Sequence, residues 1–115
     1  MYTKKYAKSL FGKGYGKLID RLFKEVGKEH IDGIKPKYGR IDLYISGPEE
    51  LRDIGYEIER ESERTCEECG KPGEQKSINY WITTLCEKCY NKNTSVIKYK
   101  NILYFERGKL WIKKY

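Results

Sequence analysis

All four cysteines of this 115-residue chain lie in one stretch, as two Cys-x-x-Cys pairs. Cys66 and Cys69 form the first pair, and Cys86 and Cys89 form the second. Two thiolates in each of two tight turns complete a tetrahedral four-sulfur shell, which is the arrangement of structural zinc sites. The sequence therefore predicts one structural Zn²⁺ per chain, held by these four cysteines.

Length and composition predict a single small domain outside the membrane. A chain of this size has a modest hydrophobic core, so a metal site adds needed stability. No apolar run approaches the roughly 18 residues that span a bilayer, and residues 1–9 are too polar for a secretory signal. We therefore expect a cytoplasmic protein with no membrane partner, where a reducing environment favours bound metal over disulfides.

The spacing of apolar residues predicts an α+β fold. Apolar side chains at four-residue spacing indicate a helix over residues 17–30, ended by Gly33. Strict alternation of apolar and polar residues indicates a half-buried strand over residues 40–46. A narrow apolar stripe after Pro48, with acids in the first turn, indicates a second helix over residues 49–64.

The segments flanking these elements differ in character. Residues 1–16 are basic and rich in glycine without an apolar period, so we expect a flexible arm. Their Gly-x-Gly-x-Gly-Lys run is a poor phosphate loop, because Leu18 stands where such a loop needs Ser or Thr. Within one domain of residues 1–115, the predicted parts are the arm (1–16), a helix–strand–helix unit (17–64), a four-cysteine zinc finger (65–93) and a basic β tail (94–115).

Two zinc-finger architectures are compatible with the cysteine pairs. Gly70 permits the turn of a zinc knuckle after the first pair, residues 78–85 are β-prone and supply one arm of a hairpin, and the second pair can start a helix. These features together favour a treble clef, with a zinc ribbon as the alternative. We predict no enzyme, because four sulfur ligands leave no open metal position.

Charge is segregated along the chain, whose formal net charge is +7. The second helix carries an acidic face that can dock onto a basic partner protein. Its candidate partner-binding residues are Glu49, Glu50, Asp53, Glu57 and Glu61. The tail interleaves basic and aromatic residues in a predicted β-meander, a pattern typical of nucleic-acid contact. Its candidate residues are Lys98, Lys100, Arg107, Lys109, Trp111 and Lys113.

The chain resembles a family of small uncharacterised phage and prophage proteins over roughly residues 17–90. The resemblance rests on Lys-Tyr-Gly-Arg and the strand that follows (residues 37–47), the acidic helix, Thr-Cys-Glu-Glu-Cys-Gly-Lys-Pro-Gly (residues 65–73), Trp81 and Thr-Leu-Cys (residues 84–86). That family pairs a Lys-aromatic-Gly-Gly strand motif with a C-terminal zinc knuckle. Arg40 stands where a second glycine is usual, and the tail after Lys92 looks like an addition.

The resemblance implies a viral origin and a zinc site, without an established activity. Small phage proteins without a catalytic site often block a host machine. We therefore favour a noncatalytic inhibitor of a host protein, such as a nucleic-acid-processing defence enzyme. Its most specific target would be an RNA-guided CRISPR nuclease, which would make the chain an anti-CRISPR protein. The alternative is a nucleic-acid-binding zinc-finger protein, a small regulator that uses the basic aromatic tail.

Overall fold

A computed structural model describes residues 2–78 and 80–92 and confirms an α+β fold. One antiparallel hairpin pairs β1 (Ile31–Lys37) with β2 (Arg40–Ile45), and a second pairs β3 (Glu74–Ile78) with β4 (Trp81–Leu85). The helices are α1 (Lys4–Ser9), α2 (Gly16–Glu25) and α3 (Glu49–Ser62), with 3₁₀ turns η1 (Lys13–Tyr15) and η2 (Lys28–His30). Residues 87–92 are also helical.

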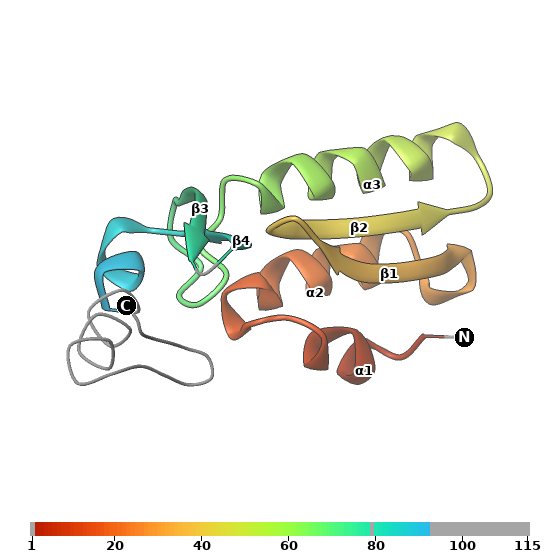
Figure 1. The fold of residues 1–115 in the computed structure, drawn as a ribbon. Helices are drawn as coiled ribbons and strands as arrows, with labels where there is room; N and C mark the ends of the chain where they lie inside the picture. The colour runs from red at the N-terminus through yellow and green to blue at the C-terminus, as the bar shows by residue number, and fades with distance from the viewer. Residues whose placement is uncertain (1, 79, 93–115) are drawn as a thin grey trace.

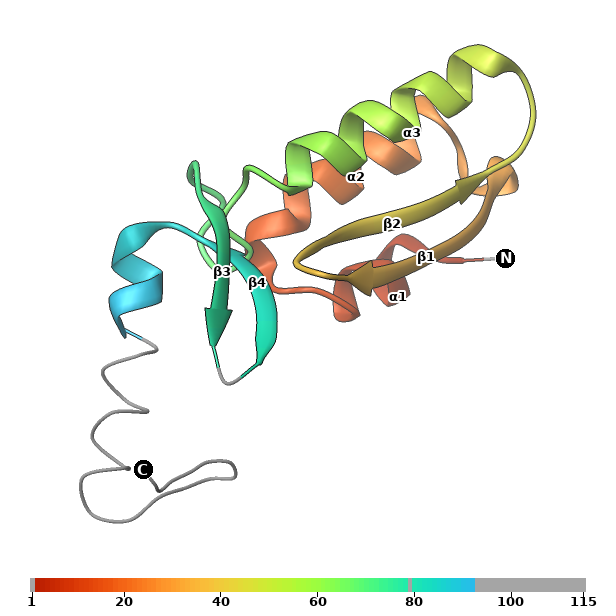
Figure 2. The same ribbon diagram turned by 45° about the horizontal axis from the view of Figure 1, so that its top comes forward.

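The main core lies where α2 and α3 pack against the β1–β2 hairpin. Figure 1 shows α3 running beside β2, with α1 on the side of β1. The buried apolar side chains of this core are Ala7, Tyr15, Leu18, Ile19, Leu22, Val26, Ile31, Ile34, Ile41 and Ile58. The β3–β4 hairpin and the last described helix lie at the end of the molecule where β1 turns into β2 (Figure 2).

The predicted strand is confirmed as β2, but its partner β1 was not predicted. Pro36 lies inside the hairpin and pairs with Ile41, although proline usually interrupts a strand. Proline is tolerated there because β1 is an edge strand in a two-stranded sheet, so the missing N–H faces away from β2. Tyr38 and Gly39 connect the strands with φ of 50° and 77°, the backbone of a two-residue type I′ turn.

The predicted helices have different outcomes. The helix expected over residues 17–30 is α2, which ends earlier, at Glu25. It ends there because Gly27 adopts φ of 92°, which a helix cannot contain. Gly27 rather than Gly33 is therefore the stop signal. The second helix is confirmed as α3, with Pro48 preceding it and Glu49 and Glu50 in its first turn.

The prediction of a flexible N-terminal arm is wrong for residues 4–15. Thr3 caps α1 by accepting a hydrogen bond from the Tyr6 N–H at 3.1 Å. Ala7 and Tyr15 are fully buried in the core. The sequence pattern missed this packing because the segment contributes isolated buried residues rather than a periodic apolar face.

The free edge of β2 is covered by side chains of α3. The strand register turns the N–H groups of Ile41 and Leu43 away from β1. Ser62 Oγ accepts the Ile41 N–H at 2.9 Å, and Glu59 Oε2 accepts the Leu43 N–H at 2.7 Å. These bonds replace a third strand, so a helix rather than another chain satisfies this edge.

Arg40, the first residue of β2, is surrounded by acids. Its guanidinium lies 3.6 Å from Asp42, 3.7 Å from Glu59 and 3.6 Å from Glu63. The side chain thus joins the start of β2 to the last two turns of α3.

Two further expectations concern the C-terminal tail and the absence of a membrane-spanning helix. The predicted β-meander and all six candidate nucleic-acid residues of the tail lie outside the described residues. In the described part of the chain, no helix is long and apolar enough to cross a membrane.

Candidate metal centre

The four predicted ligands come together at the end of the molecule formed by β3 and β4. The sulfur atoms of Cys66, Cys69, Cys86 and Cys89 all lie within 4.8 Å of one another. None of the four is in a disulfide. Among residues 2–78 and 80–92, this is the one group of three or more Cys, His, Asp or Glu side chains arranged to hold a metal ion.

The spacing of the sulfur atoms matches a tetrahedral shell. The Sγ atoms of Cys69 and Cys86 are 3.7 Å apart. A tetrahedron with metal–sulfur bonds of about 2.3 Å has sulfur–sulfur edges of about 3.8 Å. The donor set is therefore both chemically and geometrically suited to a four-coordinate metal ion.

The first cysteine pair sits in a turn whose backbone is hydrogen-bonded at both ends. The Gly70 N–H donates to the Cys66 carbonyl at 2.9 Å, and the Cys66 N–H donates to the Lys71 carbonyl at 2.7 Å. Gly70 adopts φ of 84°, a backbone conformation that glycine reaches without steric cost. This closed turn presents both thiols of the first pair to the same point.

The second pair lies where β4 gives way to the last described helix. Leu85 ends β4, residues 87–92 are helical, and the Tyr90 N–H donates to the Cys86 carbonyl at 2.9 Å. The Cys89 N–H points at Cys86 Sγ at 3.5 Å. The start of this helix therefore sets the spacing of Cys86 and Cys89, whereas the turn at Gly70 sets the spacing of Cys66 and Cys69. The predicted hairpin arm is confirmed for residues 81–85, whereas Ile78 belongs to β3.

The surroundings of Cys66 and Cys89 shift the pKa values of their thiols in opposite directions. Burial raises the pKa of the Cys66 thiol, but N–H groups of Cys86, Cys69 and Glu68 outweigh this and lower the pKa to about 7. The hydrogen bond with the Cys86 sulfur raises the pKa of Cys89 to about 12. Four crowded thiols therefore cannot all ionise on their own, and a cation removes that conflict.

The glycine run of the N-terminal segment packs against the first cysteine turn. The Gly14 N–H donates to the Glu67 carbonyl at 2.7 Å, and the Gly12 N–H donates to Glu67 Oε2 at 3.1 Å. A Cβ added at Gly14 would lie 2.2 Å from the Cys66 carbonyl oxygen. These glycines are required for close backbone approach rather than for phosphate binding, and sequence reasoning missed this role.

Glu67 and Tyr15 join the metal-binding part to the rest of the fold. The other carboxylate oxygen of Glu67 accepts from Thr83 Oγ1 at 3.3 Å, and the Glu67 N–H donates to the Thr84 carbonyl at 2.9 Å. The Tyr15 hydroxyl lies 2.8 Å from the Ser62 carbonyl and 3.0 Å from the Gly39 carbonyl, and these two acceptors share its one proton. Each residue occupies a variable position of its motif, Glu67 between the first two cysteines and Tyr15 within the glycine run, so only the tertiary structure reveals this role.

The five candidate partner-binding acids are all exposed on α3. Arg21 of α2 binds two of them, at 2.7 Å from Glu57 and 3.8 Å from Glu61. The other three are Glu49, Glu50 and Asp53, and no described residue forms an ion pair with them. The open part of the acidic face is therefore the first half of the helix.

Comparison of the chain with protein-family models, with curated proteins and with solved structures finds no match.

Proposed function

We propose that this chain is a noncatalytic zinc-binding protein that binds a basic surface of another protein through α3. The cluster of four cysteine sulfurs supports zinc as the metal, because a shell of four thiolates at tetrahedral spacing is typical of structural zinc. Such a shell has no open position, so the metal stabilises the fold and leaves recognition to the surface.

The zinc site is proposed to be a treble clef. A cysteine turn, the β3–β4 hairpin and a second cysteine pair at a helix start follow one another in the order of that architecture. A zinc ribbon would place both pairs on turns, whereas residues 87–92 here are helical.

The observation that carries the binding function is the open acidic face of α3. Glu49, Glu50 and Asp53 have no ion-pair partner among the described residues, and they sit on a helix held by β2 and α2. Carboxylates fixed on a rigid element favour fast association with a basic surface and discriminate against acidic ones.

The family resemblance extends this proposal to a biological setting. A phage or prophage protein with this surface would block a host nucleic-acid-processing enzyme by covering its basic groove. An RNA-guided CRISPR nuclease is the most specific target we propose, since such enzymes hold nucleic acid in a positively charged channel.

A charge-reversal experiment tests the proposal. The assay is target-DNA cleavage by purified RNA-guided nucleases, with the chain added before the guide and after it. We expect inhibition by the natural chain and at least a tenfold weaker effect of the Glu49→Lys/Asp53→Lys double variant. The Glu29→Lys/Glu87→Lys variant is the matched control, since it changes the same net charge at exposed acids elsewhere. Equal activity of the two variants would contradict the assignment to α3.

Nucleic-acid binding is the second candidate function. Tyr80 and Trp81 are exposed at the tip of the β3–β4 hairpin, and Trp81 keeps 72% of its surface accessible. Exposed aromatic rings stack on unpaired bases, and the basic tail would supply the phosphate contacts.

Fluorescence anisotropy with single-stranded DNA, RNA and duplex DNA separates this second candidate from the first. Binding that survives physiological salt and weakens in a Trp81→Ala variant would favour nucleic acid as the partner. Binding that disappears as salt rises, without preference among the three, would remove this candidate.

A further inference from the structure

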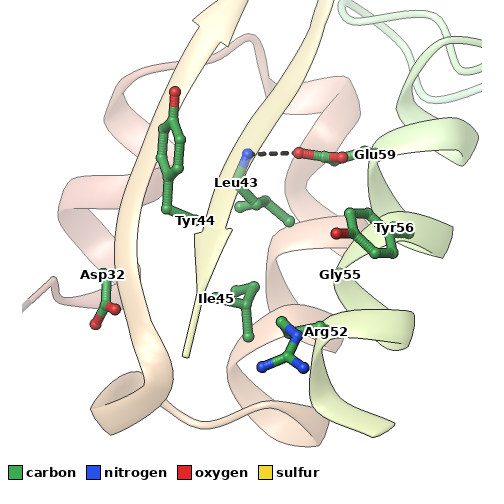
Figure 3. Close-up of a pocket in the computed structure, with 8 residues that line it drawn as sticks. All are labelled: Asp32, Leu43, Tyr44, Ile45, Arg52, Gly55, Tyr56 and Glu59. Atoms are coloured by element: carbon green, nitrogen blue, oxygen red, sulfur yellow. Dashed lines mark hydrogen bonds between the residues drawn. The ribbon is translucent and has the colours of Figure 1, made fainter. Parts of the chain in front are cut away.

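A groove runs along the surface of the main core where β2 packs beside α3 (Figure 3). Its volume is 210 Å³. The residues that line it are Asp32, Leu43, Tyr44, Ile45, Arg52, Gly55, Tyr56 and Glu59. None of these residues is a metal ligand, and the groove is separate from the cysteine cluster.

The groove has an apolar floor beside the exposed ring of Tyr56. Leu43 and Ile45 are half-buried, and they can lie close to the helix because Gly55 has no side chain. A Cβ at Gly55 would lie 3.0 Å from Ile45 Cγ1. Tyr56 keeps 54% of its surface exposed. Tyr44 is also half exposed, but its ring lies over β1, with Lys35 Nζ 5.7 Å from the ring centre.

The rim of the groove carries the polar side chains Asp32, Arg52 and Glu59. Arg52 donates one guanidinium N–H to the Gly47 carbonyl at 2.8 Å and keeps other N–H groups for a bound segment. Glu59 already accepts from the Leu43 N–H at 2.7 Å. Figure 3 shows Tyr44 and Asp32 on the strand side, with Tyr56, Glu59 and Arg52 on the helix side.

The size of the groove limits what it can hold. Sites for whole cofactors or drug-sized molecules have volumes of roughly 300–1,000 Å³, which is larger than this groove. A single aliphatic or aromatic side chain of a larger partner suits it better. Tyrosine and arginine around an apolar floor are also the residue types that dominate binding energy at protein interfaces.

The acidic face of α3 borders this groove and determines the charge of its occupant. Glu49 lies three residues before Arg52, and Asp53 lies three residues before Tyr56, so each is one turn from a residue that lines the groove. A bound segment that inserts a side chain beside Tyr56, over Leu43 and Ile45, therefore passes the unpaired carboxylates.

We propose that the groove between β2 and α3 takes one aliphatic or aromatic anchor side chain of a partner polypeptide, flanked there by lysine or arginine. This inference rests on the proposed function and deepens it, because it places the partner's anchor beside the acidic face. The carboxylates contribute charge selectivity, and the groove contributes affinity through apolar burial.

Two short peptides test the proposal directly. The probes are acetylated and amidated pentapeptides, Lys-Lys-Leu-Lys-Lys and Lys-Lys-Ala-Lys-Lys, titrated into ¹⁵N-labelled zinc-loaded protein at low salt. We expect the leucine peptide to bind at least fivefold more tightly, because it buries three more carbon atoms. The largest amide shifts should fall at Leu43, Ile45 and Gly55.

Matched variants test whether the leucine side chain binds in this groove. Tyr56→Ala should reduce the affinity for the leucine peptide to that for the alanine peptide. Tyr80→Ala, which truncates an exposed tyrosine elsewhere, should change neither. The amide spectrum of each variant shows whether it is folded. Equal binding of the two peptides by the natural chain, or equal effects of the two tyrosine variants, would overturn the proposal.

The charge-reversed variant separates this inference from the function on which it rests. If Glu49→Lys/Asp53→Lys weakens binding of both peptides while leucine and alanine bind alike, the acidic face is supported and the groove is not. If neither peptide binds the natural chain, both the groove and the acidic face are contradicted.

Discussion

The N–H of Gly14 donates to the carbonyl oxygen of Glu67 at 2.7 Å, inside the turn that joins Cys66 to Cys69. This bond connects the N-terminal segment to the metal-binding turn across more than fifty residues of sequence. The cysteine cluster therefore supports the packing of the N-terminal helices as well as that of its own hairpin.

Replacing Gly14 with alanine should strongly destabilise the protein. The added Cβ would lie 2.2 Å from the Cys66 carbonyl oxygen and 2.5 Å from that of Glu67. Both are backbone atoms, so no side-chain rotation relieves the contact. We expect a loss of about 2–4 kcal/mol in the free energy of unfolding, measured in urea.

Gly16→Ala is the matched control for that substitution. No atom lies within 4 Å of a Cβ built there, and its backbone is helical with φ of −55°. We expect no loss, or a gain of up to about 1 kcal/mol, because alanine reduces the entropy of the unfolded chain. Equal destabilisation by both variants would show that the N-terminal segment is not packed as described.

Truncating Glu67 should loosen the N-terminal segment without removing the metal. Its carboxylate accepts from the Gly12 N–H at 3.1 Å and from Thr83 Oγ1 at 3.3 Å. We expect Glu67→Ala to cost about 1–3 kcal/mol and to speed hydrogen exchange at Gly12. Glu87→Ala, an exposed acid in the same part of the chain, should change neither quantity. Unchanged exchange at Gly12 in Glu67→Ala would contradict this linkage.

Metal removal should unfold more than the cysteine-containing segment. We expect mass spectrometry to find one zinc per chain and a chelator to remove it. Hydrogen exchange should then become fast in β3, β4 and at Gly14, since metal binding and folding are coupled. Added Zn²⁺ should restore the natural chain but not Cys89→Ser. A chain that contains no zinc, or that keeps its melting temperature after chelation, would contradict the structural metal site.

The hydroxyl of Tyr15 should contribute stability that depends on pH. It donates to the buried carbonyl of Ser62 at 2.8 Å, so Tyr15→Phe should cost about 1–2 kcal/mol near pH 8. Burial raises the pKa of Tyr15 above its usual value. The phenol therefore stays protonated in the folded chain while it ionises in the unfolded chain above about pH 10.

The sign of this effect follows from proton release on unfolding. The contribution of the hydroxyl is fully present below about pH 10 and falls by about 1.4 kcal/mol for each pH unit above it. Urea titrations at pH 8 and pH 11 should thus show a smaller difference between the natural chain and Tyr15→Phe at the higher pH. The same comparison with Tyr6→Phe, whose ring is half exposed, should show no such change. A difference that is constant with pH would contradict the burial argument.

Patterns that repeat locally were sufficient to predict part of this protein. The two cysteine pairs identified the four sulfurs that come together, alternation over residues 40–46 identified β2, and the apolar stripe with its acidic first turn identified α3. Each of these signals comes from neighbouring residues whose spacing matches the geometry of one element. The same reasoning did not identify β1, because a strand tolerates a proline such as Pro36 only where the missing N–H lies on its unpaired edge.

The sequence by itself determined the four-cysteine candidate metal centre, the acidic helix and the α+β class, because turn spacing and helical or strand periodicity are local properties. Only the tertiary structure decided that the glycine run docks onto the cysteine turn, that Arg21 binds Glu57 and Glu61, and that a groove opens between β2 and α3. These relationships join residues far apart in the chain. They depend on how elements pack rather than on any spacing along the sequence, so no local pattern records them.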